Sequence, residues 1–501
     1  MPINISSLRL HFLCGYFALG SFVWGYNIGI LSTVYVHPGF KQALGHPSSS
    51  QTGLITAIYY LGTWLSYLFL SHPTSDLLGR RYAALVGMLV ACFGSALIAG
   101  ASGGPSGAYT MVIIGRIIGG LGIAVVSTSV PLYQSEIAPP KQRGKLVVMN
   151  HIGLVAGLAV AFWVGYGISH WDSPRGSSVG WRVSISLQFF PAAIMCLGMP
   201  FVPETPRWLL LRHRADEALK SLIYFREGTF SDEQIRDELQ DIHRSIGAQM
   251  PTFTRWLELF SKPALFQRLW RAALLQFMAQ MCGATAMKYY LPTLFRKLSL
   301  GTRLALMVGG IESTLKIGCT VIEMMIVDRA GRRNTMAAGA LGMSIAMLIN
   351  GALPIVYPNN ANRASDYACI VFIFIYTFSY SLGFGPGAWV YGSEIFPTTH
   401  RAVGLNVAAS FGAIGSIVTA QVWPVGIDNV GSNIYFYFMA INLACVPVIW
   451  FLYPETKKRP LETINVLFDN SDSIAQDWRS SRVEVINSGF GKEQTTVNIA
   501  E

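Results

Sequence analysis

Charged side chains are scarce in this chain. Only 13% of its 501 residues are Asp, Glu, Lys or Arg, whereas soluble globular domains carry about 25%. This scarcity excludes an ordinary soluble protein, and the mean hydropathy of +0.41 agrees. The net charge of +10 does not indicate a nucleic-acid partner, because the basic residues lie in short connections between apolar segments instead of forming one patch.

Cysteine is also rare, with seven residues that fall in apolar segments and show neither paired nor metal-ligand spacing. We therefore expect no disulfide and no metal site. A nucleophile–base pair and a nucleotide-binding loop are both missing, so the sequence predicts neither an enzyme nor a cofactor. The first apolar segment lacks a small-residue cleavage site, which favours a retained span over a signal peptide.

Apolar stretches of about 20 residues recur along the whole chain, and each is long enough to cross a bilayer as a helix. Their centres lie near residues 20, 61, 91, 118, 156, 192, 280, 315, 344, 378, 413 and 442. We therefore predict an all-α membrane protein with twelve transmembrane helices. If the spans alternate, the basic connections share one side, which makes that side and both termini cytoplasmic.

Three short motifs occur twice, in the same order and about 250 residues apart. The motif at 79–81 matches that at 331–333, the motif at 135–139 matches that at 393–397, and Pro203-Glu204-Thr205 matches Pro454-Glu455-Thr456. In a membrane protein, such a duplication predicts two pseudo-symmetric six-helix bundles around a transport path.

The expected domain boundaries follow from these spans and from the polar segments between them. They are an N-terminal cytoplasmic tail at 1–9, six-helix bundles at 10–202 and 269–452, an intracellular helical linker at 203–268, and a largely disordered cytoplasmic tail at 453–501.

Taken together, the motifs resemble those of the sugar porter branch of the major facilitator superfamily, in its fungal form, over about residues 14–467. The matching strings are Asp76 to Arg81, Gly115-Arg116, Pro131 to Gly144, Pro203 to Trp208, Gln280 to Tyr290, Asp328 to Arg333, Gly385 to Trp389, and Pro454 to Lys457. The resemblance implies a carrier in the plasma membrane that moves a sugar-like polyhydroxylated molecule across the lipid bilayer by alternating access.

The resemblance also assigns roles to the duplicated charges, as ion-pair clusters that hold the cytoplasmic side shut and break when it opens. The alternative is that the arginines only set the topology. The two clusters would consist of Arg80, Arg81, Glu136, Arg143 and Glu204, and of Arg332, Arg333, Glu394, Arg401 and Glu455.

In the substrate path, Gln276 and Gln280 lie one turn apart on the seventh span and resemble the amides that bind sugar hydroxyls. Hydrogen bonding between helices is the alternative. Tyr289 and Tyr290 resemble the external gate. Trp389 resembles the aromatic floor beneath the sugar, unless it only packs at an interface.

Five pocket positions depart from the usual sugar-porter pattern, so the pocket need not bind glucose. The departures are His151, Ala279, Thr285, Lys316 and Gly412-Ala413. We still expect His151, Thr285 and Lys316 to contact the substrate, together with Asn27.

Intramembrane charges gather in the second half of the chain. Glu312, Lys316 and Glu323 share one face of the eighth span, and Lys288 lies in the seventh. Because charges in spans are costly, these must face protein or water. The glutamates either neutralise the lysines, or a lysine receives an anionic substrate group, or a glutamate carries protons.

Proton-driven sugar porters carry an aspartate at the position of Asn27, near the arginine that matches Arg116. Asparagine does not titrate, so this coupling route is missing and the sequence favours uniport. Two alternatives stay open. One is a proton-coupled carrier of a sugar acid, quinate-like acid or secondary metabolite, motivated by Lys288, Lys316 and His151. The other is a non-transporting nutrient sensor.

The substitution Asn27→Asp is therefore expected to be silent or inhibitory, because no existing proton route is restored by one added carboxyl. Uptake of the substrate with and without a protonophore measures this. Collapse of wild-type uptake with the protonophore would contradict uniport.

Overall fold

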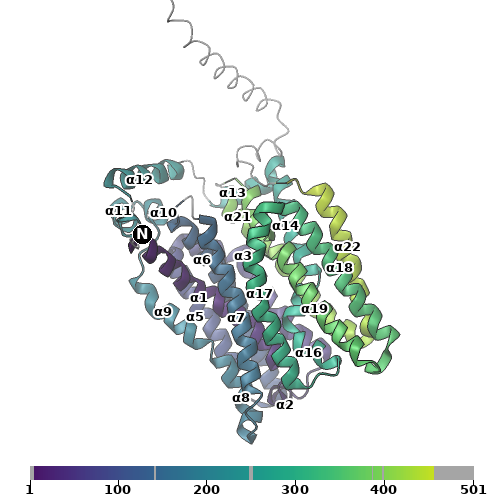
Figure 1. Ribbon diagram of the computed structural model, residues 1–501. Coiled ribbons are helices and arrows are strands. Elements are labelled where there is room, and N and C mark those ends of the chain that lie inside the picture. Colours follow the sequence, from purple (N-terminus) through teal and green to yellow (C-terminus); the bar gives the residue numbers. More distant parts are fainter. Residues whose placement is uncertain are drawn as a thin grey trace, which may run out of the picture.

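The computed structural model describes residues 5–139, 143–228, 230–247, 252–385, 387–397 and 400–455, and within these ranges the ordered elements are all helices (Figure 1). The predicted C-terminal tail therefore lies almost entirely outside the described residues. Helices of the first half are α1 (Ile5–Val34), α2 (Pro38–Ala43), α3 (Ser49–Phe69), α4 (Ser71–Leu78), α5 (Arg80–Ala99), α6 (Gly104–Ile137), α7 (Arg143–Ile168), α8 (Pro174–Ser186), α9 (Phe189–Gly198) and the 3₁₀ turn η1 (Met199–Phe201).

Four short helices connect the halves: α10 (Pro206–Leu211), α11 (Ala215–Arg226), α12 (Asp232–Gly247) and α13 (Thr252–Ser261). The second half then consists of α14 (Pro263–Met281), α15 (Ala284–Tyr289), α16 (Leu291–Lys297), α17 (Thr302–Ala330), α18 (Arg332–Val356), η2 (Pro358–Asn360), α19 (Arg363–Phe384), α20 (Gly387–Ile395), α21 (Arg401–Asn429), η3 (Gly431–Asn433) and α22 (Ile434–Leu452).

The predicted twelve-helix, two-bundle architecture is confirmed. Within the described residues, ten helices are long and apolar enough to span a membrane, and the pair α3–α4, bent by 53°, adds an eleventh. The twelfth is the broken seventh span, where α14 and α15 meet at Gly283. Each predicted centre falls within a helix.

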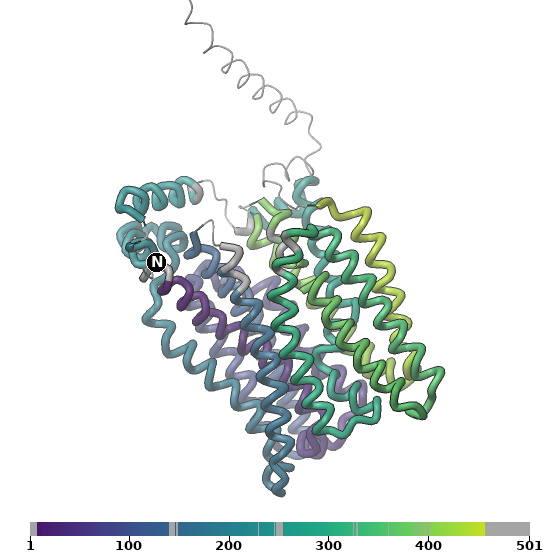
Figure 2. Tube along the Cα trace, viewed as in Figure 1, coloured from purple at the N-terminus to yellow at the C-terminus, as the bar shows by residue number. Residues whose placement is uncertain are grey.

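The two halves use the same packing scheme, as the duplicated motifs predict. In the first half α1 lies along α7, and in the second half the equivalent helix α14 lies along α21. The halves meet through two equivalent pairs, α3 with α21 and α17 with α7. Figure 2 shows the halves side by side, purple to blue and green to yellow.

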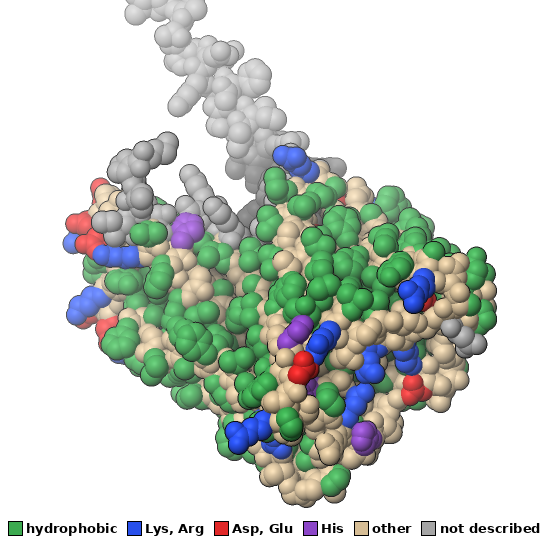
Figure 3. Space-filling model, turned by 60° about the horizontal axis from the view of Figure 1, so that its bottom comes forward, with side chains coloured by type: hydrophobic (Ala, Val, Ile, Leu, Met, Phe, Trp, Pro, Cys, Tyr) green, Lys and Arg blue, Asp and Glu red, His purple; other side chains and the backbone are tan. Residues whose placement is uncertain are grey.

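Helices α10–α13 gather at one end of the bundles, which we call the linker end (Figure 1). The opposite end, with α2 and α16, is the far end. Hydrophobic side chains cover the flanks of the molecule in Figure 3, whereas charged side chains concentrate on the far-end face turned toward the viewer. This distribution suits a bundle whose flanks face lipid.

Close contact between α1 and α7 depends on glycine. A Cβ atom on Gly157 would overlap the backbone carbonyl oxygen of Phe22, and one on Gly25 would overlap that of Leu154. Because the obstacle is backbone, no side-chain rotation can relieve it. Small residues that allow such close approach drive helix association in lipid.

The substitution Gly157→Ala is therefore expected to separate α1 from α7 and to lower the yield and melting temperature of the purified protein. Gly167→Ala, in the same helix, is the matched control because nothing lies within 4 Å of its added Cβ. Equal melting temperatures for the two variants would contradict the close packing.

Candidate functional site

Members of the first predicted ion-pair cluster meet at the linker end. Arg80 begins α5 and lies 3.1 Å from the carboxylate of Glu136, near the end of α6, and both side chains are 6% exposed. The hydroxyl of Thr205 donates to the same carboxylate at 2.6 Å. Three separate segments therefore meet at one buried pair.

Glu204 stabilises the start of α5. Its carboxylate accepts hydrogen bonds from the backbone N–H groups of Arg81, at 3.1 Å, and Thr205, at 2.9 Å. A carboxylate at a helix N-terminus is favoured by the helix dipole. Gly79, with φ of +93°, makes room, because a Cβ there would overlap the Glu204 carboxylate. Burial raises the pKa of Glu204, and the two N–H donors oppose this rise.

The second cluster repeats the first. Arg332 lies 3.0 Å from Glu394. The Glu455 carboxylate accepts from the backbone N–H groups of Arg332, at 3.0 Å, and Arg333, at 3.1 Å. Gly331, with φ of +94°, makes the same room as Gly79. Arg401 begins α21. The side chain of Arg143 lies outside the described residues.

Sequence reasoning missed two members of this linker-end network. Asp76 lies 3.3 Å from Arg80, and its place in the quoted motif was the available signal. Arg226, 2% exposed, pairs with Glu238 at 2.8 Å and donates to the carbonyl of Ile137 at 2.9 Å. Arg226 lies in the linker, outside the duplicated motifs, so the duplication could not reveal it.

Contacts between the halves occur at the two tyrosines predicted as the gate. The Tyr290 hydroxyl donates at 3.0 Å to Thr56 of α3 and to the carbonyl of Ala420, while its ring stacks on Tyr35. The Tyr289 hydroxyl accepts a hydrogen bond from Arg116 at 3.2 Å. Both tyrosines therefore link the first half to the second on the far-end side.

Arg116 is 1% exposed and has only neutral hydrogen-bond partners within the described residues. It donates to the side-chain oxygen of Asn27 at 2.8 Å and to the carbonyl of Ile55 at 3.2 Å, and it lies 4.0 Å from the ring centre of Tyr59. Asn27 and Arg116 are therefore hydrogen-bonded neighbours.

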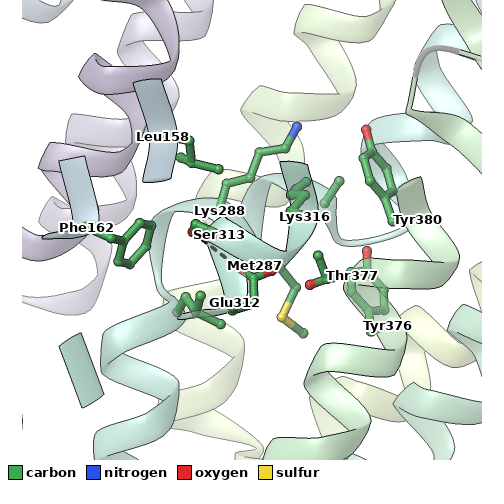
Figure 4. Close-up of a pocket in the computed structure, with 12 residues that line it drawn as sticks. Leu158, Phe162, Met287, Lys288, Glu312, Ser313, Lys316, Tyr376, Thr377 and Tyr380 are labelled. Atoms are coloured by element: carbon green, nitrogen blue, oxygen red, sulfur yellow. Dashed lines mark hydrogen bonds between the residues drawn. The ribbon is translucent and has the colours of Figure 1, made fainter. Parts of the chain in front are cut away.

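A cavity lies between the halves, where α7 faces α15, α17 and α19 (Figure 4). Of the predicted substrate-binding residues, only Lys316 lines it, together with the predicted intramembrane charges Lys288 and Glu312. The complete lining is Leu158, Phe162, Ala284, Met287, Lys288, Leu291, Glu312, Ser313, Lys316, Tyr376, Thr377 and Tyr380.

The two cavity lysines approach the same aromatic ring. The ammonium nitrogens of Lys288 and Lys316 lie 5.3 and 5.7 Å from the ring centre of Tyr380. Glu312 accepts a hydrogen bond from Ser313 at 3.1 Å. Within the described residues, no ion pair joins either lysine to Glu312 or Glu323, so direct neutralisation by the glutamates is not observed.

The other predicted substrate-binding residues lie outside this lining, and their roles stay predictions. The Gln280 side chain accepts a hydrogen bond from the Thr285 hydroxyl at 3.2 Å. Gln276 is buried and lies against Gly412, since a Cβ atom added to Gly412 would be 3.4 Å from the Cβ of Gln276. His151 lies within electrostatic range of both lysines. Trp389 is 39% exposed.

Two cavity tyrosines, Tyr376 and Tyr380, escaped sequence reasoning although a signal existed. They lie four residues apart in the tenth span, which places them on one helical face, and Thr377 lies between them. The Tyr376 hydroxyl donates to the carbonyl of Cys282 at 3.0 Å, next to the break in the seventh span.

Removing the Glu136 carboxylate should be costly, because among the described residues it leaves the buried Arg80 with Asp76 as its one ion-pair partner. We expect Glu136→Gln to cost about 3 kcal/mol of stability, measured as a lower melting temperature in detergent. The control is Glu217→Gln, because its pair with Arg214 is about half exposed and such pairs contribute about 0–1 kcal/mol. Equal losses in the two variants would contradict a stabilising role for the buried pair.

Comparison with known proteins agrees with this architecture. The family model described as "Sugar (and other) transporter" matches residues 13–468. The chain is 30% identical to the MFS-type transporter criB of Aspergillus cristatus, over 93% of this chain and 95% of that protein. It is also 30% identical to the probable quinate permease of Aspergillus niger, over 98% of this chain and 95% of that protein.

Among solved structures, the inward-open conformation of the xylose transporter XylE from E. coli superposes with a TM-score of 0.77 at 23% identity. The superposition covers 92% of this chain and all of that one, which shows that the fold is shared. With twelve spans in two matching halves and a family match over most of its length, the chain belongs to the sugar porter family of major facilitator transporters.

Proposed function

We propose that this protein is a secondary carrier of a small hydroxylated carboxylic acid, with quinate as its representative. The observation that carries the proposal is the pair of lysines, Lys288 and Lys316, that line one cavity and share Tyr380 without an ion-pair partner in the described residues. Because unpaired charges inside a bilayer are costly, such residues commonly mark the substrate path.

Charge balance favours a monoanion as the ligand. Two lysines and one glutamate line the cavity, so its basic side chains outnumber its acidic ones by one. A single carboxylate balances this excess and reduces the repulsion between Lys288 and Lys316. Hydrogen bonds to charged groups contribute about 1.5–3 kcal/mol, so the lysines can discriminate an acid from its neutral analogue.

Hydroxyl recognition is supplied by the remaining polar side chains. Ser313, Thr377 and Tyr380 offer donors and acceptors around the cavity, and Phe162 offers an apolar face. This combination suits a ring that carries several hydroxyl groups. The names of several relatives, which include quinate permeases of Aspergillus and Neurospora, support the same class of substrate.

Alternating access follows from the two ends of the molecule. We propose that the linker end faces the cytoplasm, because it carries the duplicated arginines. The tyrosine contacts on the far-end side would then close the cavity to the outside. The two ion-pair clusters would hold the cytoplasmic side shut and break when it opens, as the halves rock against each other at the plasma membrane.

A neutral sugar is the second candidate. It is favoured by the amide pair Gln276 and Gln280 on the seventh span and by the sugar porter family itself. The two candidates differ in the charge of the ligand, so competition between an acid and a neutral analogue separates them.

The variant Lys316→Gln should lower affinity for quinate by tenfold or more, since a loss of about 1.4 kcal/mol corresponds to tenfold. Affinity for inositol, a neutral cyclic polyol, should be unaffected by the loss of charge. Competition against labelled quinate uptake in a transporter-null host measures both. Lys220→Gln, an exposed lysine on α11, is the control. An unchanged preference in Lys316→Gln would contradict the proposal.

A further inference from the structure

Glu323 is a buried acid that the cavity does not use. It lies on α17, seven residues beyond Lys316 toward the linker end, or about 10 Å along the helix axis. Glu323 is only 1% exposed, and within the described residues no side chain is hydrogen-bonded to its carboxyl group. Glu312, by contrast, accepts a hydrogen bond from Ser313.

The carboxyl of Glu323 packs against the break in the tenth span. Helix α19 ends at Phe384 and α20 begins at Gly387. A Cβ on Gly385 would come 2.9 Å from the carbonyl oxygen of Ser381 and 3.1 Å from one carboxyl oxygen of Glu323, so the carboxyl lies directly against the break. The backbone N–H of Gly387 is a nearby donor.

The charged and titratable groups around Glu323 are few. Lys316 and Cys319 lie on the same helix, and Tyr380 lies on α19. Lys316 already faces the cavity and the ring of Tyr380. Within the described residues, Glu323 therefore has no cation at ion-pair distance.

An ionised carboxylate without a cation partner is very costly in a dry helix interface, whereas the neutral acid is tolerated. The packing of α17 against α19, with Glu323 beside the break, therefore favours the protonated carboxyl. Movement of α20 about Gly385 would admit water to the carboxyl and release that proton. Hinges of this kind are typical of gated carriers.

We propose that Glu323 is the proton-binding group that couples this carrier to the pH gradient. In each cycle the carboxylate takes a proton from water on one side, carries it through the closed state as the neutral acid, and releases it to water on the other side. This inference rests on the proposed function. It departs from the uniport expectation, because Asn27 removes one proton route while Glu323 supplies another.

Proton coupling through Glu323 determines how much net charge crosses the membrane in each transport cycle. One proton that moves together with one carboxylate monoanion transfers no net charge. A pH gradient therefore drives accumulation, whereas a membrane potential alone does not. A neutral substrate with one proton would instead respond to both driving forces.

The test uses the purified full-length protein in proteoliposomes with labelled quinate. Wild type should accumulate quinate when the outside is acidic, and a potassium diffusion potential without a pH gradient should give no accumulation. Glu323→Gln should lose accumulation above the equilibrium level while keeping quinate exchange within about twofold of wild type. Asp366→Asn, another buried acid, at the start of α19, is the control and should behave as wild type.

Several results would overturn the inference. Accumulation by Glu323→Gln equal to that of wild type shows that the proton binds elsewhere. Exchange by wild type without accumulation under a pH gradient shows a uniporter. Should Glu323→Gln fail to fold, Glu323→Asp keeps a titratable group and must accumulate quinate with a shifted pH dependence, and an unshifted dependence contradicts the role. Absence of quinate exchange in wild type instead refutes the proposed substrate, and the same gradients are then applied with xylose.

Discussion

A charge inside a bilayer must be paired, hydrated or neutralised, and the functional features of this protein depend on that constraint. At the linker end the constraint is met by pairing, since Arg80 and Arg332 each contact a glutamate of a neighbouring helix. In the middle of the second half it is not met by ion pairs within the described residues. In our proposals, Lys288 and Lys316 bind the carboxylate of the ligand, and Glu323 binds a proton.

The two halves of the chain divide these tasks unequally. In the first half, Arg116 is held by neutral partners such as Asn27 and provides a fixed charge. The second half contains the ionisable residues that line the cavity and the two broken spans, at Gly283 and Gly385. A scaffold with twofold pseudo-symmetry thus carries an asymmetric binding site, as a substrate without that symmetry requires.

Much of the fold was predictable from the sequence, because apolar length and repeated motifs are local signals. The twelve spans and the duplication follow from them, whereas the cluster that contains Arg80 and Glu136 was implied by the resemblance to sugar porters. The cavity was less predictable. Tyr376 and Tyr380 are ordinary residues for an apolar helix, and only packing shows that they meet the lysines. Likewise, spacing predicted a shared face for Glu312, Lys316 and Glu323, but not that Glu312 lines the cavity while Glu323 lies against Gly385.

The central claim is that the two lysines bind a carboxylate between the halves. An experimental structure determined in the presence of quinate tests it most directly. We predict density for the carboxylate group within hydrogen-bond distance of Lys316 or Lys288, with the ring hydroxyl groups toward Ser313 and Thr377. Quinate bound elsewhere, or lysines paired with Glu312 and Glu323 beside an empty cavity, would contradict it.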